Sequence, residues 1–495
     1  MKLQIERNSK VPVYSQIIRQ LRRRILSGEL PGGSALPSER NLAQLLGVHR
    51  NTVVRAYGEL KADGLIQARR GSGYVVCASE TQEAFPVSLR PGRRASRGKS
   101  VNWVNQIKKE HLDMETAFDD LFERADGVAR YSLGSGIAQA GVYDREKLAR
   151  DVSRLIARED PERGFHCPYK GDRGLRQQVV SFLSTKGIHA SVGEIQIVQE
   201  MNQAMLFLAT LLIRPGDTVP MEEPASPDVY RIVELAGGKP VFVPVDRDGM
   251  DCGVLEKLVR SRKPRLIFVN SSFHDPTGAI LSTERRRRII ELSNAFRIPV
   301  IEEDAASELV YEGESIPPVK ALDTLGNVIY IYSFSLTFVP GLSLAFVAAD
   351  KSVIESMSHL VSLTMTAPGW MTQKLAQAYL EDGSYYACLD AFRARYASKQ
   401  RLVCRMLDDM TPLGVSYERP RGGVYVWCRL PEGIDSKVLA ARAAGRGLTL
   451  MPGYLFYPGK KAGRDHIRIS YSYEPEEHLA EGMELLRKTL EELLR

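Results

Sequence analysis

Strand-length apolar runs and helical patterns alternate along the chain from about residue 113 to its C-terminus. This alternation predicts β-α-β units, which fold into a mostly parallel sheet with helices on both faces. The strands that we expect lie at 195–198, 218–221, 239–245, 265–269, 299–302, 328–332 and 344–348. After about residue 375, long helical patterns and a strand pair around residues 422–427 predict a smaller C-terminal α+β subdomain.

The first 77 residues have a different pattern, of three short helices followed by a hairpin. Apolar residues recur at helical spacing between residues 14 and 25. Ser38 can cap a second helix that stops at Gly47, and a three-residue turn then leads to a third helix that ends at Gly64. Residues 65–76 fit two short strands joined by a glycine-rich tip. The fold class is therefore α/β with an N-terminal winged helix-turn-helix.

Positive charge is concentrated at the front of the chain. The net charge is +7, and residues 1–77 alone hold 13 Lys/Arg against 5 Asp/Glu. A basic N-terminal region followed by a mildly acidic one is typical of a nucleic-acid-binding module joined to another domain. A basic surface that only contacts solvent would have the same charge. Residues 78–104 are basic, poor in apolar residues and without periodicity. We therefore expect a DNA-binding domain at 1–77, a flexible linker at 78–112 and an effector and dimerisation domain at 113–495.

Residues suited to double-stranded DNA gather at the start of the third helix and at the hairpin tip. The first residues of a recognition helix reach base edges in a major groove. A glycine-rich tip brings its arginines to a minor groove or a phosphate. Each arginine taken alone is equally an ordinary surface charge, but their common spacing favours DNA contact. The expected DNA-binding residues are Arg40, His49, Arg50, Asn51, Thr52, Arg55, Arg69, Arg70, Gly71 and Gly73.

Three runs in this region carry a family resemblance: Leu36-Pro37-Ser38-Glu39-Arg40, Leu46-Gly47-Val48-His49-Arg50-Asn51-Thr52-Val53 and Arg69-Arg70-Gly71-Ser72-Gly73-Tyr74-Val75. They resemble the DNA-binding head of the GntR family of bacterial transcription regulators, over essentially all of residues 10–77. His49 departs from the family, which usually has a serine there. The resemblance implies that this domain binds an operator in DNA.

Residues 328–349 carry no charge and are long enough for a crude transmembrane count. Serines, a threonine and a central Pro340-Gly341 interrupt the run, so it predicts two buried strands around a polar loop. The six cysteines are scattered without paired spacing, which fits a reducing cytosol and no metal site. We expect a cytoplasmic protein with no membrane segment.

Four further motifs lie in the large domain: Tyr169-Lys170-Gly171-Asp172, Arg214-Pro215-Gly216-Asp217, Asp275-Pro276-Thr277-Gly278 and Ile467-Arg468-Ile469-Ser470. Their order resembles that of the fold-type I aminotransferases. Joined to a GntR head through a long linker, the chain is similar to the MocR subfamily. The resemblance implies a domain that binds pyridoxal phosphate, senses an amino-acid or vitamin-related effector and forms a head-to-tail dimer.

The positions that hold pyridoxal phosphate in that family are altered here. The Schiff-base lysine position is Leu336, which has no amine, and the phosphate-binding arginine position is Ser343. At the turn that cradles phosphate the chain has Glu200, whose carboxylate would repel a phosphate. Two positions for cofactor-contacting tyrosines hold Ser226 and Ala305. We therefore expect no pyridoxal phosphate cofactor, and covalent binding at Leu336 is not possible.

A few polar residues of the site remain as candidates for binding a small ligand, and they are Asp275, Asp304, Ser333, Ser335 and Arg468. In the family Arg468 would hold a substrate carboxylate, but a structural ion pair explains it equally well. Glu303 or Asp304 could face a ring nitrogen, although a solvated strand end is the interpretation that we favour.

Together these observations predict a DNA-binding transcription regulator that is not an enzyme. We expect a homodimer whose two heads meet operator half-sites, and a possible amino-acid-like effector bound without a covalent bond. Two alternatives stay open. One is an active pyridoxal-phosphate enzyme fused to a DNA-binding head, against which Leu336 argues. The other is a large domain that only dimerises or binds another protein.

Overall fold

The computed structural model describes residues 13–26, 30, 33–62, 65–69, 73–76, 130–139, 144–158, 166–339, 341–365, 369–459 and 462–495. The chain divides into two compact units, Met1–Thr116 and Ala117–Arg495. The expected linker at 78–112 lies outside the described residues.

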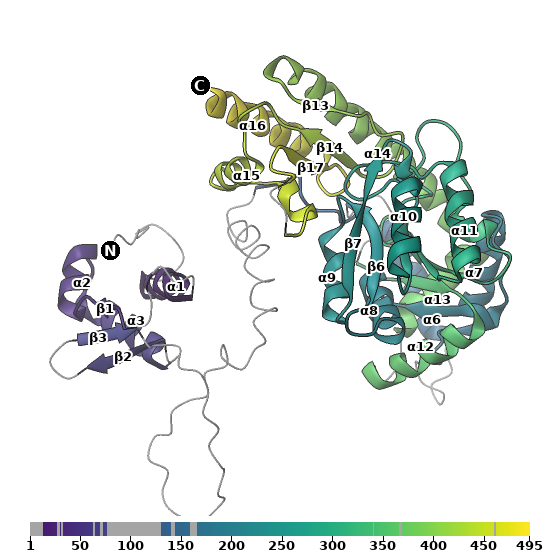
Figure 1. Ribbon diagram of the computed structural model, residues 1–495, viewed down its shortest axis with the longest axis horizontal. Coiled ribbons are helices and arrows are strands. Elements are labelled where there is room, and N and C mark those ends of the chain that lie inside the picture. The colour runs from purple at the N-terminus through teal and green to yellow at the C-terminus, as the bar shows by residue number, and fades with distance from the viewer. Residues whose placement is uncertain are drawn as a thin grey trace, which may run out of the picture. The chain divides into compact units, whose positions relative to one another are not determined.

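The first unit contains three helices and a three-stranded antiparallel sheet (Figure 1). Its elements are α1 (Val13–Leu26), β1 (Ala35–Leu36), α2 (Glu39–Leu46), α3 (Arg50–Ala62), β2 (Ile66–Arg69) and β3 (Gly73–Val76). Side chains of all three helices and of the strands, among them Leu21, Leu42 and Tyr57, form one buried core. This arrangement confirms the winged helix-turn-helix. Strand β1, which pairs with β3, was not expected from the sequence.

The central sheet of the second unit has the strand order β5-β12-β11-β10-β9. Its strands are β5 (Ile195–Val198), β9 (Ile267–Asn270), β10 (Val300–Asp304), β11 (Val328–Ser333) and β12 (Ala345–Ala348). Strands β9, β10 and β11 are parallel, and β12 is antiparallel to both of its neighbours. A second sheet joins β6 (Thr218–Glu223), β7 (Lys239–Asp246) and β8 (Gly249–Met250), with β6 and β7 parallel.

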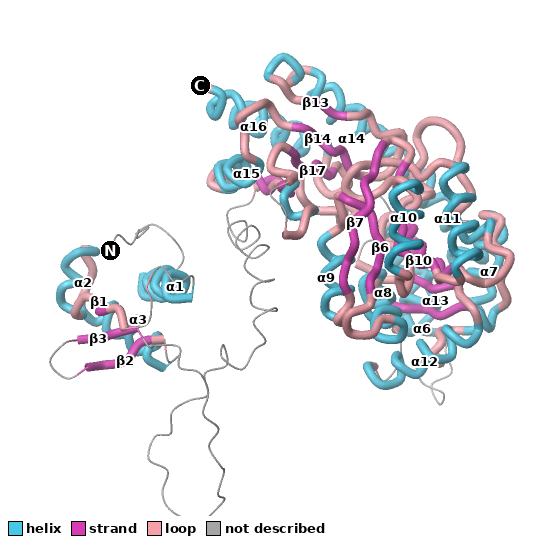
Figure 2. Tube along the Cα trace, viewed as in Figure 1, coloured by secondary structure: helices cyan, strands magenta, loops and turns pink. Residues whose placement is uncertain are grey.

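Both faces of the central sheet are covered, because alternate side chains of one strand belong to different cores. Ile329 and Ile331 of β11 pack into a core that also draws on α8 and α12, whereas Tyr330 and Tyr332 pack into the larger core. Two-sided burial explains why these strands are continuous apolar runs in the sequence. Figure 2 shows helices on either side of the strands. The helices are α6 (Arg145–Arg158), α7 (Arg173–Thr185), α8 (Met201–Leu212), α9 (Pro227–Leu235), α10 (Cys252–Arg262), α11 (Thr283–Phe296), α12 (Lys351–Thr364) and α13 (Trp370–Glu381).

The C-terminal part forms the expected smaller subdomain. A four-stranded sheet of order β13-β14-β17-β16 lies with the long helices, and a short strand pair joins β15 to β4. The elements are β4 (Tyr131–Ser132), α14 (Ser384–Asp408), β13 (Ser416–Tyr417), β14 (Tyr425–Arg429), α15 (Ser436–Ala444), β15 (Leu448–Thr449), β16 (Met451–Pro452), β17 (His466–Ser470) and α16 (Glu476–Leu494). Residues 130–139 are therefore tied to the C-terminal subdomain rather than to the central sheet.

The uncharged run at 328–349 forms β11, a polar loop and β12, as expected. Within the described ranges no helix has the length and apolar character needed to span a bilayer.

Candidate DNA-binding surface and candidate ligand cavity

The turn between α2 and α3 sets the direction of the recognition helix. Ser38 accepts a hydrogen bond from the Asn41 backbone N–H, which caps α2 as expected. Gly47 ends α2 with a left-handed backbone, φ 62°, which glycine adopts without steric cost. His49 then accepts the Asn51 backbone N–H through Nδ1 at 3.3 Å, so it caps α3 in place of the serine usual in the family.

The carboxylate of Glu39 holds the start of the recognition helix and the wing together. Arg50 donates from Nη2 to one Glu39 oxygen at 3.1 Å, and the Tyr74 hydroxyl donates to the other at 3.0 Å. The Arg50 side chain is 66% exposed in spite of this contact, so its guanidinium can still reach a base or a phosphate. Glu39 thus limits the directions in which Arg50 can extend.

The other expected DNA-binding residues fall into three groups. Arg40 and Asn51 are exposed, and Thr52 is half-buried on α3. Arg55 stacks over the Tyr14 ring, 3.7 Å from its centroid, and donates to the Tyr14 hydroxyl at 3.0 Å. Arg69 pairs with Gly73 across the two wing strands, while Arg70 and Gly71 lie outside the described residues.

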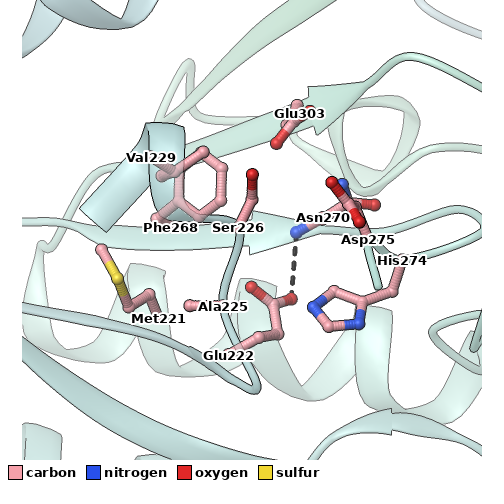
Figure 3. Close-up of a pocket in the computed structure, with 10 residues that line it drawn as sticks. All are labelled: Met221, Glu222, Ala225, Ser226, Val229, Phe268, Asn270, His274, Asp275 and Glu303. Carbon is pink, nitrogen blue, oxygen red and sulfur yellow. Dashed lines mark hydrogen bonds between the residues drawn. The ribbon is translucent and has the colours of Figure 1, made fainter. Parts of the chain in front are cut away.

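The second unit has a small cavity where β6, β9 and β10 end (Figure 3). Its volume is about 10 Å³, which is about the space that one bound water molecule needs. Ligands of open α/β sheets bind beyond the carboxyl ends of the parallel strands, which is where this cavity lies. Its walls are Met221, Glu222, Ala225, Ser226, Val229, Phe268, Asn270, His274, Asp275 and Glu303.

The cavity is unusually rich in buried acids. Burial raises the pKa of Glu222 to about 8, although its carboxylate accepts the Asn270 backbone N–H at 2.9 Å. Burial and the nearby Asp275 raise the pKa of Glu303 to about 8. Burial also raises the pKa of Asp275 and lowers that of His274 to about 3. At neutral pH Glu222 and Glu303 therefore each hold a proton, and His274 is neutral.

Two of the residues expected to bind a ligand are paired with each other. Arg468 donates from Nη1 to both Asp275 oxygens, at 2.7 and 2.9 Å, and from Nη2 to the Gly134 carbonyl at 2.8 Å. Its guanidinium also lies over the Tyr425 ring, 4.2 Å from the centroid. Of the two interpretations of Arg468, a substrate-carboxylate contact or a structural ion pair, the structure shows the ion pair.

The remaining candidates lie away from the cavity walls. Asp304 is fully buried and accepts the Tyr330 hydroxyl at 2.6 Å and the Ser307 backbone N–H at 2.9 Å. Glu303 lines the cavity instead. The preferred interpretation of both acids as a solvated strand end was wrong, because β9 and β11 flank β10 and bury its end. The hydroxyl of Ser333 donates to Ser335, which donates to Glu200 at 3.3 Å.

The residues present do not fit pyridoxal phosphate. Leu336 is buried in the largest hydrophobic core, and Ser343 is exposed. Glu200 is the N-cap residue of α8, and its carboxylate accepts from Ser335 rather than from the helix N–H groups, so it adds a negative charge where a phosphate would bind. The cavity walls include no lysine.

Buried lysines elsewhere in the described residues are already engaged. Lys399 donates to the Ser472 carbonyl at 3.0 Å, and burial lowers its pKa to about 8. Lys320 pairs with Asp323 at 2.9 Å, and Lys186 with Glu308. None of the three lines the cavity, so none replaces the missing amine.

Sequence reasoning missed Glu222, Asn270 and His274 as cavity residues. A usable signal existed for Glu222, because it directly follows the apolar strand expected at 218–221, where side chains at the carboxyl end of a parallel strand face the crevice. The sequence signal for Asn270 was weaker. Asn270 is the last residue of β9, and the carboxyl end of a parallel strand faces the crevice. We found no group of acid, histidine or cysteine side chains suited to a metal ion in the described ranges.

Comparison with known proteins matches both units. Residues 13–76 match the description "Bacterial regulatory proteins, gntR family", and residues 136–486 match "Aminotransferase class I and II". The probable rhizopine catabolism regulatory protein MocR of Rhizobium meliloti is 27% identical, covering 91% of this chain and 88% of that protein. The chain belongs to the aminotransferase class I and II family and is a MocR-type regulator.

Other relatives agree with the MocR-type assignment. The uncharacterized HTH-type transcriptional regulator YisV of Bacillus subtilis is 28% identical, over 99% of this chain and 98% of that protein. The large unit is similar to the multiple substrate aminotransferase of Thermococcus profundus, with a TM-score of 0.73, 25% identity, and coverage of 79% of this chain and 99% of that one. This MocR-type chain is therefore a DNA-binding transcription regulator with an aminotransferase-like domain.

Proposed function

We propose that this regulator controls transcription without pyridoxal phosphate chemistry, and that its large domain dimerises and senses a small molecule bound without a covalent bond. The observation that carries the proposal is the cofactor site itself. Leu336 lies in the core where the family has its lysine, and Glu200 adds a carboxylate at the start of α8, and both features speak against attachment of the cofactor.

The polar lining of the cavity supports sensing. Buried acids and a buried asparagine are costly to keep unless something pairs with them. A domain used for dimerisation alone would have no need of them. The cavity also lies at the sheet edge where α/β proteins bind ligands.

The head supports sequence-specific operator binding. Arg50 and Asn51 stand at the start of α3, which is the part of a recognition helix that reaches base edges. A homodimer would present two such heads, so we expect an operator made of two repeated or palindromic half-sites.

The test begins with duplexes of random sequence, from which the full-length protein selects its own site, followed by footprinting. The wild-type protein should protect two half-sites. The double variant Arg50→Ala, Arg55→Ala should lose that footprint. Arg260→Ala, which removes an exposed arginine of the large unit, is the matched control and should keep it. An unchanged footprint for the double variant, with its helical content intact, would refute operator binding through α3.

A further inference from the structure

The amino ends of four strands in the second unit form one continuous edge, at the opposite end of the strands from the cavity. Strand β6 is parallel to β7, and β10 is parallel to β9. The Arg265 backbone N–H donates to the Thr218 carbonyl at 2.9 Å, so the starts of β6 and β9 also lie side by side. Helices α10 and α11 lead into β9 and β10, which places their C-terminal ends at this edge (Figure 1). The two helix ends are neighbours, because the Arg260 guanidinium lies 5.3 Å from the centroid of the Phe296 ring.

Exposed cations stand at the start of each of these strands or at the end of the helix before it. They form a surface, the amino-edge surface, that consists of Arg214, Lys239, Arg262, Lys263, Arg265 and Arg297. Among the described residues only Arg265 of this set has an ion-pair partner, Asp217, at 3.9 Å. Glu234 is a further acid nearby in sequence, and the charge of Arg231 already acts on it. The amino-edge surface therefore has an excess of positive charge within a domain that is mildly acidic as a whole.

Two of these cations have a backbone conformation that favours glycine. Lys263 ends α10 with φ 46° and Arg297 ends α11 with φ 55°, and both are left-handed. Phe273 is the one other non-glycine residue with a positive φ in the described part of the chain. A side chain in this conformation costs free energy that glycine avoids. Residues that keep such strain are concentrated at functional sites, and here the strain falls on two neighbouring cations.

The helix dipole does not account for these two positions. Cations near a helix C-terminus are stabilising, but Arg260 and Arg262 already supply them in the last turn of α10. Glycine at position 263 or 297 would end the helix without strain. The side chains of Lys263 and Arg297 therefore bring a charge to the surface at a cost to the fold.

We propose that the amino-edge surface binds the phosphates of DNA that flanks the operator half-sites. This inference rests on the proposed operator binding and adds a second DNA contact to that of α3. Neighbouring strands lie about 4.8 Å apart, so the amino ends of four strands span roughly 14 Å, over which a duplex carries about eight phosphates. A row of unpaired cations of this length is complementary to that charge. The head and the large unit belong to one chain, so a DNA-bound head keeps flanking duplex at a high effective concentration around the surface.

The experiment compares the binding of the full-length protein to two duplexes. One contains only the half-sites that the footprint defines, and the other extends them by two helical turns, about 20 bp, on each side. The wild type should protect the flanks of the longer duplex and bind it at least about tenfold more tightly at low salt. Its affinity for the longer duplex should also fall more steeply with salt concentration. Equal affinities and equal salt dependence for the two duplexes would overturn the inference.

A double glycine variant separates DNA binding from stability. Lys263→Gly with Arg297→Gly removes two charges and relieves the left-handed strain at both helix ends. It should lose the flanking protection, and the slope of log affinity against log salt for the longer duplex should fall by about two, one for each phosphate contact. Its affinity for the shorter duplex and its thermal midpoint should not decrease. A lower midpoint would assign the two cations to the stability of the helix ends and would overturn the inference.

A second pair and a control locate the surface. Arg214→Gln with Lys239→Gln removes two charges at the starts of β6 and β7, and it should weaken binding to the longer duplex in the same way. Arg401→Gln with Arg405→Gln, which changes two exposed arginines of α14, is the matched control and should leave that binding unchanged. Unaltered flanking protection in both amino-edge pairs would overturn the inference.

The same measurements separate this inference from the proposed operator binding. A footprint limited to the half-sites, which no amino-edge variant changes, refutes the flanking contact alone. The absence of any footprint on the selected duplexes refutes the proposed regulation. Vesicles that contain phosphatidylserine test the other polyanion that such a surface fits. Vesicle binding that the amino-edge variants lose, with binding to the longer duplex intact, would assign the surface to a membrane and overturn the inference.

Discussion

The guanidinium of Arg468 donates to both carboxylate oxygens of Asp275, at 2.7 and 2.9 Å, across 193 residues of sequence. This pair joins β17 of the C-terminal subdomain to the loop that follows β9. Because the Arg468 side chain is only 7% exposed, no water can replace Asp275 at full strength.

The variant Asp275→Asn should therefore destabilise the large unit. Removing one partner of a buried ion pair costs about 3–5 kcal/mol, and we expect the lower end because the amide still accepts one hydrogen bond. Thermal unfolding followed by tryptophan fluorescence measures it, since Trp370 and Trp427 lie in this unit. Asp390→Asn breaks the exposed pair with Arg393 and is the control. Equal midpoints for the two variants would contradict the structural role of the pair.

Stability should depend on pH through Glu303. Its pKa rises from the usual 4.5 to about 8 in the folded chain, so between these values the folded state keeps a proton that the unfolded state has lost. The free energy of unfolding must then fall as pH rises across this interval, and the loss is complete above about pH 8.

Replacing the ionisable group of Glu303 should remove this fall in the free energy of unfolding at high pH. Glu303→Gln should be more stable than the wild type at about pH 9, by on the order of a few kcal/mol, and similar to it at about pH 4. Chemical denaturation at the two pH values is the measurement. A variant less stable than the wild type at high pH would show that the carboxylate is ionised and paired in the folded protein.

The cap of α2 offers a test within the head. Ser38→Ala removes the acceptor of the Asn41 N–H and should weaken α2 by about 1 kcal/mol, whereas Ser38→Asn retains a capping oxygen. Hydrogen exchange of the Leu42 and Ala43 amides in the full-length chain should quicken about fivefold in the alanine variant only. Faster exchange in both variants would show that the loss of the capping oxygen is not the cause.

Restoring the amine alone should not restore the cofactor. Leu336→Lys leaves Glu200 at the helix terminus and Ser343 without a guanidinium, so added pyridoxal phosphate should give no visible imine band and no adduct after borohydride. The triple variant Leu336→Lys, Ser343→Arg, Glu200→Gly is the comparison and should gain the band. A band in the wild-type protein would instead favour the enzyme that the sequence left as an alternative.

Much of the fold could be predicted from the sequence, because each strand of the central sheet is buried on both faces and so appears as an apolar run. The seven expected strands overlap β5, β6, β7, β9, β10, β11 and β12. Strand β1 could not be predicted, since two residues are too few to show a period.

The candidate site was less predictable, for reasons of long-range packing. No local pattern could indicate that Arg468 pairs with Asp275 or that Gly134 lies beside them, because these contacts join distant parts of the chain. The burial of Glu303 and Asp304 also depends on β9 and β11, which the neighbouring residues do not reveal. By contrast, the prediction that Leu336 takes the Schiff-base position rests on its motif alone and stays a prediction.

The bond from Arg468 to the Gly134 carbonyl links the cavity to the segment that precedes α6. That segment is fixed to the C-terminal subdomain by β4 and by the Ser132 N–H on Glu474, and it leads in sequence toward the DNA-binding head. Arg468 therefore contacts the cavity wall through Asp275 and the first described segment of the large unit through the Gly134 carbonyl.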